Sequence, residues 1–244
     1  MTAPLTPVAG SALRGDASWW SSTWPSCQPV GFADAVLAGA APRRLEAGEV
    51  ILPAHDVDCG IVAVIAGSAD IHLLSADGAR HLVSVRQAEH WCGRCELVPL
   101  TPPDLVVTAR TAVHLVHLPV ERVRRLVLEH PGGPAAFADL VAQEARWLTT
   151  MLDAATERRT VARVARKLLA AFGRGDRRSL RLTQDELAEM TTLSRGTVNR
   201  ILAEFENDGA ITTGYGRLAI ADRARLRRAA GLAGDADRGS RPTR

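Results

Sequence analysis

The clearest pattern of apolar and polar positions lies between residues 182 and 220. Thr183 and Glu186 have the spacing of a capping box, which predicts the start of a short helix. Residues 191–193 interrupt the pattern as a turn, and Ser194 is placed to cap a second helix. The apolar positions recur at helical spacing as Leu187 and Met190 in the first segment and Val198, Ile201, Leu202 and Phe205 in the second. The pattern therefore predicts two short helices, each with one buried face, joined by a tight turn.

The other face of the second predicted helix is polar and basic, and carries Arg195, Gly196, Thr197, Asn199 and Arg200. Residues 207–209 end this helix, and residues 211–220 predict a two-stranded wing that turns around Gly214-Tyr215-Gly216. In a helix-turn-helix protein the N-terminal part of the second helix enters the major groove, where Arg pairs with guanine and Asn with adenine. A helical hairpin with a solvated basic face is the alternative. DNA binding is favoured because cap, turn, polar face and wing occur together and in order.

The same stretch supplies the candidate DNA-binding residues. We expect Arg195 and Arg200 to contact guanine, with Thr197 and Asn199 in support. The expected contacts to phosphate are Thr183, Gln184, Ser194 and Arg217.

Residues 43–118 show a different pattern, in which short apolar runs are separated by Gly, Asp and Pro. The runs are 50–52, 61–66, 69–74, 81–85, 105–109 and 113–118. Gly67 stands where the chain must turn, and Asp77-Gly78 is a signal for a tight hairpin. Several short strands at this spacing predict a small antiparallel barrel or jelly roll.

Three further segments have helical periodicity: residues 119–130, 137–156 and 161–172. The apolar stripe of the long middle segment, which includes Leu148 and Leu152, is able to pack on its own barrel or on a second copy of the chain. A dimer is favoured, because a helix-turn-helix protein needs two copies about 34 Å apart to contact two half-sites.

Composition narrows the functional classes. The 244 residues are enough for about two domains with real cores. The net charge of only +3 means that any nucleic-acid surface is local. We find neither a signal peptide nor a membrane-spanning run, and therefore expect a cytoplasmic protein that does not bind membranes. No catalytic constellation appears, so an enzyme is not expected; a thiol- or haem-based enzyme with an accessory DNA module is the alternative.

The segments SRGTVNR, ILAEFENDGAI and GRLAI, at residues 194–211 and 216–220, resemble the recognition helix and wing of the cyclic-AMP receptor / fumarate-nitrate regulator (Crp/Fnr) family of bacterial transcription factors. The segments RLEAGEVIL and DCGIVAVIAGSADIHLL, at residues 44–52 and 58–74, are similar to the start of that family's cyclic-nucleotide-binding barrel. Many relatives carry Glu where Gly196 stands, so the operator half-site is expected to differ from theirs.

The resemblance implies an α+β fold with a β jelly-roll sensor barrel, a long dimerisation helix and a winged helix-turn-helix. The expected limits are 1–30 for an N-terminal extension, 31–130 for the sensor, 131–157 for the dimerisation helix, 158–228 for the DNA-binding domain and 229–244 for a disordered tail. It also implies a homodimer on a palindromic double-stranded DNA operator, with RNA polymerase as a further partner.

The family's effector site has a Gly-Glu-Leu turn, whose Glu meets the ribose, followed by an Arg-Ser pair that neutralises the cyclic phosphate. Glu96 and Leu97 match the turn and make Glu96 the candidate ligand-binding residue, but Pro103 and Asp104 stand where Arg-Ser is expected. A carboxylate facing a phosphate is costly in a partly buried site, so cyclic AMP is disfavoured. A substitute cation remains open in Arg94 or Arg110.

Four cysteines offer another signal. Cys92 and Cys95 form a Cys-x-x-Cys turn, and Cys27 and Cys59 complete the four thiols that an iron–sulfur cluster requires. A related carbon-monoxide sensor places a haem-ligating cysteine at about the position of Cys92. The open readings are an iron–sulfur or other metal site, haem, a dithiol switch, or cysteines buried as small apolar residues. A constitutive regulator with a vestigial barrel is a further alternative.

Overall fold

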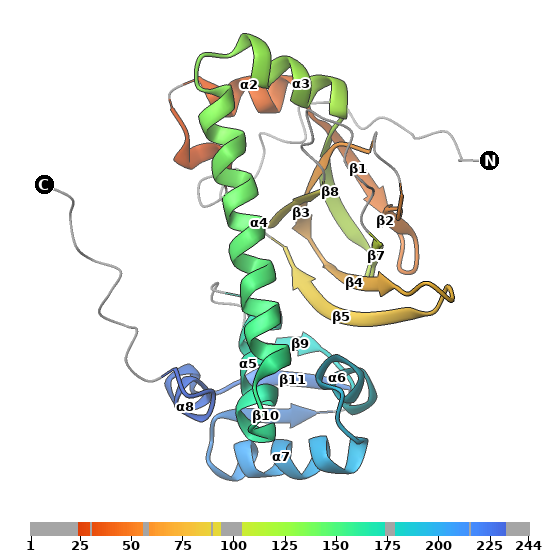
Figure 1. The fold of residues 1–244 in the computed structure, drawn as a ribbon, viewed down its shortest axis with the longest axis vertical. Coiled ribbons are helices and arrows are strands. Elements are labelled where there is room, and N and C mark those ends of the chain that lie inside the picture. Colours follow the sequence, from red (N-terminus) through yellow and green to blue (C-terminus); the bar gives the residue numbers. More distant parts are fainter. Residues whose placement is uncertain are drawn as a thin grey trace, which may run out of the picture. The chain divides into compact units, whose positions relative to one another are not determined.

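The computed structural model describes residues 24–29, 31–55, 59–88, 90–93, 104–173, 179–214 and 216–232 (Figure 1). Its internal contacts divide the chain into two units, Met1–Trp147 and Leu148–Arg244. The division falls inside helix α4 (Gly133–Thr156), which begins four residues before the helix predicted from Phe137. Each unit has its own core and is described by itself.

Two four-stranded antiparallel sheets form the barrel of the first unit (Figure 1). One sheet has the order β1 (Ala41–Leu45), β8 (Val113–Leu118), β3 (Ile61–Ala66) and β6 (His90–Gly93). The other has the order β2 (Val50–Leu52), β7 (Leu105–Ala109), β4 (Ser68–Leu74) and β5 (Arg80–Gln87). Apolar residues from both sheets pack into one core. The predicted jelly-roll architecture is confirmed.

Two of the described strands of the barrel had no sequence signal. Strand β1 contains Pro42, Arg43 and Arg44, which do not alternate with apolar residues, yet it pairs with β8 along its whole length. Strand β6 is only four residues long. Position within the sheet, rather than side-chain pattern, makes these segments strands. The hairpin at Asp77-Gly78 is present, and its loop is closed by the Ser75 backbone N–H donating to the Ala79 carbonyl at 2.9 Å.

A second core lies under the helices of the first unit, which are the 3-10 helix η2 (Trp24–Cys27), α2 (Phe32–Gly39), α3 (Val120–Glu129) and the start of α4. Trp24 is its centre: the indole lies 5.2–5.6 Å, between ring centroids, from Phe32, Trp91 and Phe137. Its Nε1–H donates to the Ala136 carbonyl at 2.8 Å. Trp24 is therefore packed onto the body of the first unit, whereas Trp19 and Trp20 lie outside the described residues.

The second unit follows the predicted order of helix, turn, helix and wing. It contains α5 (Thr160–Phe172), β9 (Ser179–Arg181), α6 (Gln184–Thr191), α7 (Arg195–Asn207), β10 (Ile211–Gly214), β11 (Arg217–Ile220) and α8 (Arg223–Ala229). The wing is a three-stranded sheet, because β9 pairs with β11.

Helix α8 is an element that the sequence pattern did not predict. Asp222 caps this helix by accepting hydrogen bonds from the backbone N–H groups of Ala224 and Arg225, and Leu226 is fully buried. One buried leucine among arginines shows no periodicity, so the sequence pattern missed the helix. The tail from residue 233 onward lies outside the described residues.

Among the helices that the structure describes, none is long and apolar enough to cross a membrane.

Candidate nucleic-acid interface

Helix α6 and its turn are built by local hydrogen bonds. The Thr183 hydroxyl accepts from the Glu186 backbone N–H at 3.2 Å, and the Glu186 carboxylate accepts from the Thr183 N–H at 2.7 Å, which completes the predicted capping box. Thr192 ends the helix in the left-handed conformation, with φ of 53°. Ser194 then caps α7 by accepting from the Thr197 N–H at 3.2 Å. These contacts set the direction of α7 relative to α6.

Helix α7 has the two faces that the sequence predicts. Its apolar residues Val198, Ile201, Leu202 and Phe205 are buried. On the other side, Arg195, Gly196, Asn199 and Arg200 are exposed and Thr197 is half-buried. The structure therefore places the candidate base-contacting residues together on one exposed surface, which we call the α7 polar face.

The polar side chains of this face are held by exchangeable partners. Arg195 lies 3.3 Å from Asp185, and Arg200 lies 2.9 Å from Glu204. The Gln184 side-chain amide of α6 donates to the side-chain Oδ1 of Asn199 at 2.9 Å. Exposed ion pairs contribute only about 0–1 kcal/mol, so DNA acceptors are able to replace these partners at low cost.

The wing is attached to α7 by Glu206, a contact that the sequence did not reveal. Its carboxylate accepts hydrogen bonds from the Thr213 backbone N–H and hydroxyl, each at 2.8 Å. These bonds lower the pKa of Glu206, because they favour its charged form. Arg217, the candidate phosphate contact on β11, is exposed.

Gly196 has no evident structural purpose. A Cβ atom built there meets nothing within 4 Å among the described residues, and its φ lies outside the positive region. Its presence leaves the backbone of the first turn of α7 uncovered.

The structure describes the side chains of two of the four cysteines. Cys92 is buried and Cys59 half-buried, and both pack into the barrel core. Burial raises the pKa of the Cys92 thiol to about 12, so it is protonated at neutral pH. The Cys27 side chain, Cys95 and Glu96 lie outside the described residues. Within the described part of the chain, no group of three or more His, Cys, Asp or Glu side chains is arranged to hold a metal.

Of the residues expected near a cyclic phosphate, the two that the structure describes, Asp104 and Arg110, do not form a cationic site. Asp104 is exposed and lies 3.7 Å from His55. Arg110 is committed to Asp70 at 2.6 Å in a largely buried ion pair. Arg94 and Pro103 lie outside the described residues.

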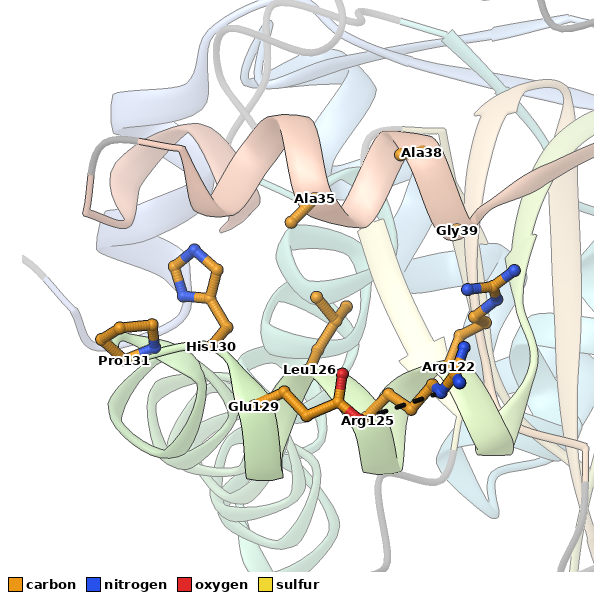
Figure 2. Close-up of a pocket in the computed structure, with 9 residues that line it drawn as sticks. All are labelled: Ala35, Ala38, Gly39, Arg122, Arg125, Leu126, Glu129, His130 and Pro131. Atoms are coloured by element: carbon orange, nitrogen blue, oxygen red, sulfur yellow. Dashed lines mark ion pairs between the residues drawn. The ribbon is translucent and has the colours of Figure 1, made fainter.

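A separate hollow of about 290 Å³ lies between α2 and α3 (Figure 2). Ala35, Ala38 and Gly39 line it from α2, and Arg122, Arg125, Leu126, Glu129, His130 and Pro131 line it from α3 and the residues that follow. Arg125 and Glu129 form a long, exposed ion pair of 3.9 Å at its edge. None of the residues predicted to bind DNA, metal or ligand lines this hollow.

Comparison with known proteins matches both units to one family. Residues 42–130 match the cyclic nucleotide-binding domain, and residues 162–229 match the Crp-like helix-turn-helix domain. The chain is 27% identical over 174 residues, 68% of its length and 78% of the relative's, to a CRP-like cAMP-activated global transcriptional regulator of Mycobacterium tuberculosis.

Solved structures share the fold. FixK2 from Bradyrhizobium japonicum aligns with a TM-score of 0.63 and 18% identity, over 78% of this chain and 96% of that one. The c-di-GMP responsive global regulator CLP from Xanthomonas campestris aligns with a TM-score of 0.60 and 19% identity, over 79% and 99%. With a nucleotide-binding-type barrel, a capped helix-turn-helix and a wing in this order, the chain belongs to the Crp/Fnr family of transcriptional regulators.

Proposed function

We propose that the chain is a homodimeric regulator that recognises a palindromic DNA operator through the α7 polar face, and that it contacts RNA polymerase as a further partner. Crp-like helix-turn-helix regulators bind DNA and are typically dimeric. In this proposal Arg195 and Arg200 contact guanine, and Thr197 and Asn199 support them. Thr183, Gln184, Ser194 and Arg217 contact phosphate and fix the register.

The proposal rests on one observation: α7 has a buried apolar face and, opposite it, an exposed polar face. The buried apolar face orients the helix, and the capped N-terminal turn presents the polar set outward. The partners of Arg195 and Arg200 are exposed carboxylates, which a guanine edge replaces without uncovering a buried charge.

The test is Arg200→Ala, with Arg80→Ala as the control for loss of one exposed positive charge in the first unit. An operator is first selected from random duplexes by the purified protein. Fluorescence anisotropy then measures the affinity of each variant for the operator and for random DNA at one salt concentration. Arg200→Ala is expected to cost about 1–3 kcal/mol on the operator and little on random DNA. Equal losses on both would remove Arg200 from the base contacts.

The proposed dimer uses the outer face of α4. Val141, Leu148 and Leu152 on this helix are 52%, 53% and 64% exposed, which is unusual for large apolar side chains at helical spacing. A second copy of α4 covers such a stripe in a coiled-coil-like contact. Leu148→Glu is expected to give a monomer in sedimentation experiments and to lose operator binding, whereas Arg146→Glu, at an exposed position nearby, keeps the dimer.

For the signal we propose the cysteines, as an iron–sulfur or other metal site, with haem or a dithiol switch as the alternatives. Support comes from Cys59 and Cys92, which share one core. These two thiols alone do not complete a four-sulfur set, and the raised pKa of Cys92 means that binding a metal must first remove its proton. An absorption spectrum of protein purified without oxygen, with iron, zinc and sulfide assays, tests this proposal. A colourless, metal-free protein whose DNA affinity does not change with oxidants would eliminate the cysteine proposal and leave the DNA proposal intact.

A further inference from the structure

Strand β5 carries two polar side chains to the interior face of the barrel. Ala69 and Ile71 of β4 belong to the barrel core, and they stand directly opposite Arg86 and Ser84 in the β4–β5 register. Directly opposed residues point to the same face of a sheet. Ser84 is 1% exposed and Arg86 is 6% exposed, so both have been taken out of water.

Helix α4 covers Arg86 with two of its own side chains. The Arg86 Nη1 and Nη2 atoms donate to the two carboxylate oxygens of Glu144 at 3.0 and 3.3 Å. The guanidinium carbon lies 4.0 Å from the centre of the Trp147 ring. Glu144 and Trp147 are three residues apart and share one face of the helix. The guanidinium of Arg86 therefore already binds one oxyanion, the carboxylate of Glu144.

This arrangement leaves buried donors unused. Arg86 Nε and Ser84 Oγ have no hydrogen-bond partner in the described part of the chain. A buried polar atom without a partner is costly, and native proteins keep few of them. These two donors come from alternate residues on one face of the strand, and one of them belongs to the guanidinium that binds Glu144. A group with several acceptor oxygens is able to accept hydrogen bonds from such donors.

We propose that Arg86 and Ser84 form a binding site for a small oxyanion, a phosphate or a carboxylate, and that the anion binds by displacing Glu144 from Arg86. The proposal does not rest on DNA binding or on the cysteines, because every residue in it lies in the first unit. The side chain of Glu144 is 30% exposed, so its carboxylate is able to turn to water when it is displaced. The anion then takes the Nη2 donor that Glu144 leaves, together with the unused Nε on the same edge of the guanidinium and the Ser84 hydroxyl.

Displacement of Glu144 alters what holds α4 on the barrel. With Glu144 bound, the ion pair and the Trp147 stack both join α4 to β5. With the anion bound, the ion pair between the two elements is lost, and only the Trp147 stack still joins α4, which continues to Thr156, to Arg86 of β5. A ligand is able to shift an equilibrium only by its different affinity for the two states, and competition for one guanidinium provides that difference.

The test compares Glu144→Gln, which removes the competing charge and keeps the side-chain shape, with Glu129→Gln as the matched control. Glu129 makes an exposed ion pair with Arg125, so its substitution changes the net charge equally without touching β5. Isothermal titration calorimetry of the full chain uses inorganic phosphate, acetate and cyclic AMP as three separate probes. Glu144→Gln is expected to bind at least one probe at least tenfold more tightly than wild type and Glu129→Gln do, and the arm that responds identifies phosphate, carboxylate or phosphodiester as the preferred chemistry.

Two further variants separate a binding site from a general change of charge or fold. Adding Arg86→Gln to Glu144→Gln is expected to abolish the gained binding. In the Glu144→Gln background, Ser84→Ala is expected to weaken the gained binding several-fold. In the wild-type background without ligand, Ser84→Ala is expected to leave the melting temperature unchanged or to raise it, because it removes an unsatisfied hydroxyl. The proposal is overturned if Glu144→Gln binds no probe more tightly than Glu129→Gln does, if the gain survives Arg86→Gln, or if Ser84→Ala lowers the melting temperature.

Discussion

Gly196 and Gly209 make a controlled test of why α7 carries a glycine in its first turn. Neither position is crowded: a Cβ at Gly196 meets nothing within 4 Å among the described residues, and one at Gly209 meets only Arg225 Nη1 at 3.8 Å. The two differ in backbone conformation. Gly209 ends α7 with φ of +69°, whereas Gly196 is an ordinary helical residue. Substitution by alanine therefore adds the same methyl group to both and separates conformation from packing.

Opposite changes in stability are expected. Alanine exceeds glycine in helix propensity, so Gly196→Ala is predicted to raise the free energy of unfolding of the second unit by about 0.5–1 kcal/mol. Gly209→Ala is predicted to lower it by about 1–2 kcal/mol, because an L-residue is strained in the left-handed region. Gly196→Ala is also predicted to weaken operator binding, since its methyl group stands on the α7 polar face between the backbone and the base edges.

Native-state hydrogen exchange of the Ile201 and Leu202 amides measures these differences in the full chain, because both residues are buried in α7. Anisotropy with the selected operator measures the affinity. A protein that is more stable and binds DNA more weakly would show that Gly196 is kept for function and not for folding. If both substitutions shift stability in the same direction, the reasoning from backbone conformation is wrong; if Gly196→Ala leaves affinity unchanged, the α7 backbone does not approach the DNA closely at this residue.

Two other predictions concern burial. Leu226→Ala is predicted to lower the free energy of unfolding by about 2–5 kcal/mol, as for other buried leucines, because this side chain of α8 is fully buried. A loss below about 0.5 kcal/mol in urea titrations would mean that α8 is not part of the folded unit. Burial raises the pKa of the Cys92 thiol from 9.0 to about 12, so the folded state keeps a proton that the unfolded chain releases. Its contribution to stability is therefore full below pH 9 and is lost as pH rises toward 12. Urea titrations at pH 8 and pH 10.5 are expected to show a smaller loss of stability in Cys92→Ala than in wild type, and equal losses would contradict the assignment.

Local chemistry made the helix-turn-helix of the second unit predictable. Capping boxes, turns and helical periodicity act within a few residues, so Thr183, Ser194 and the buried stripe of α7 lie where the sequence pattern places them. The exposure of Arg195 and Arg200 follows from the same periodicity, because the apolar stripe leaves only one face for them. The six strands predicted from apolar runs are present for a similar reason: each run is long enough to need burial on its own.

Tertiary structure decided what depends on partners distant in the chain. Strand β1 exists because β8 offers an edge to Pro42, Arg43 and Arg44, and α8 exists because Leu226 finds a core to enter. The pairing of Arg86 with Glu144 joins residues 58 positions apart, and the bond from Trp24 to Ala136 joins residues 112 apart. Spacing along the chain carries no trace of such contacts, because they form only when sheets and helices pack. The residue pattern therefore determined helix α7 and its polar face, whereas packing alone brought together the buried donors of the barrel.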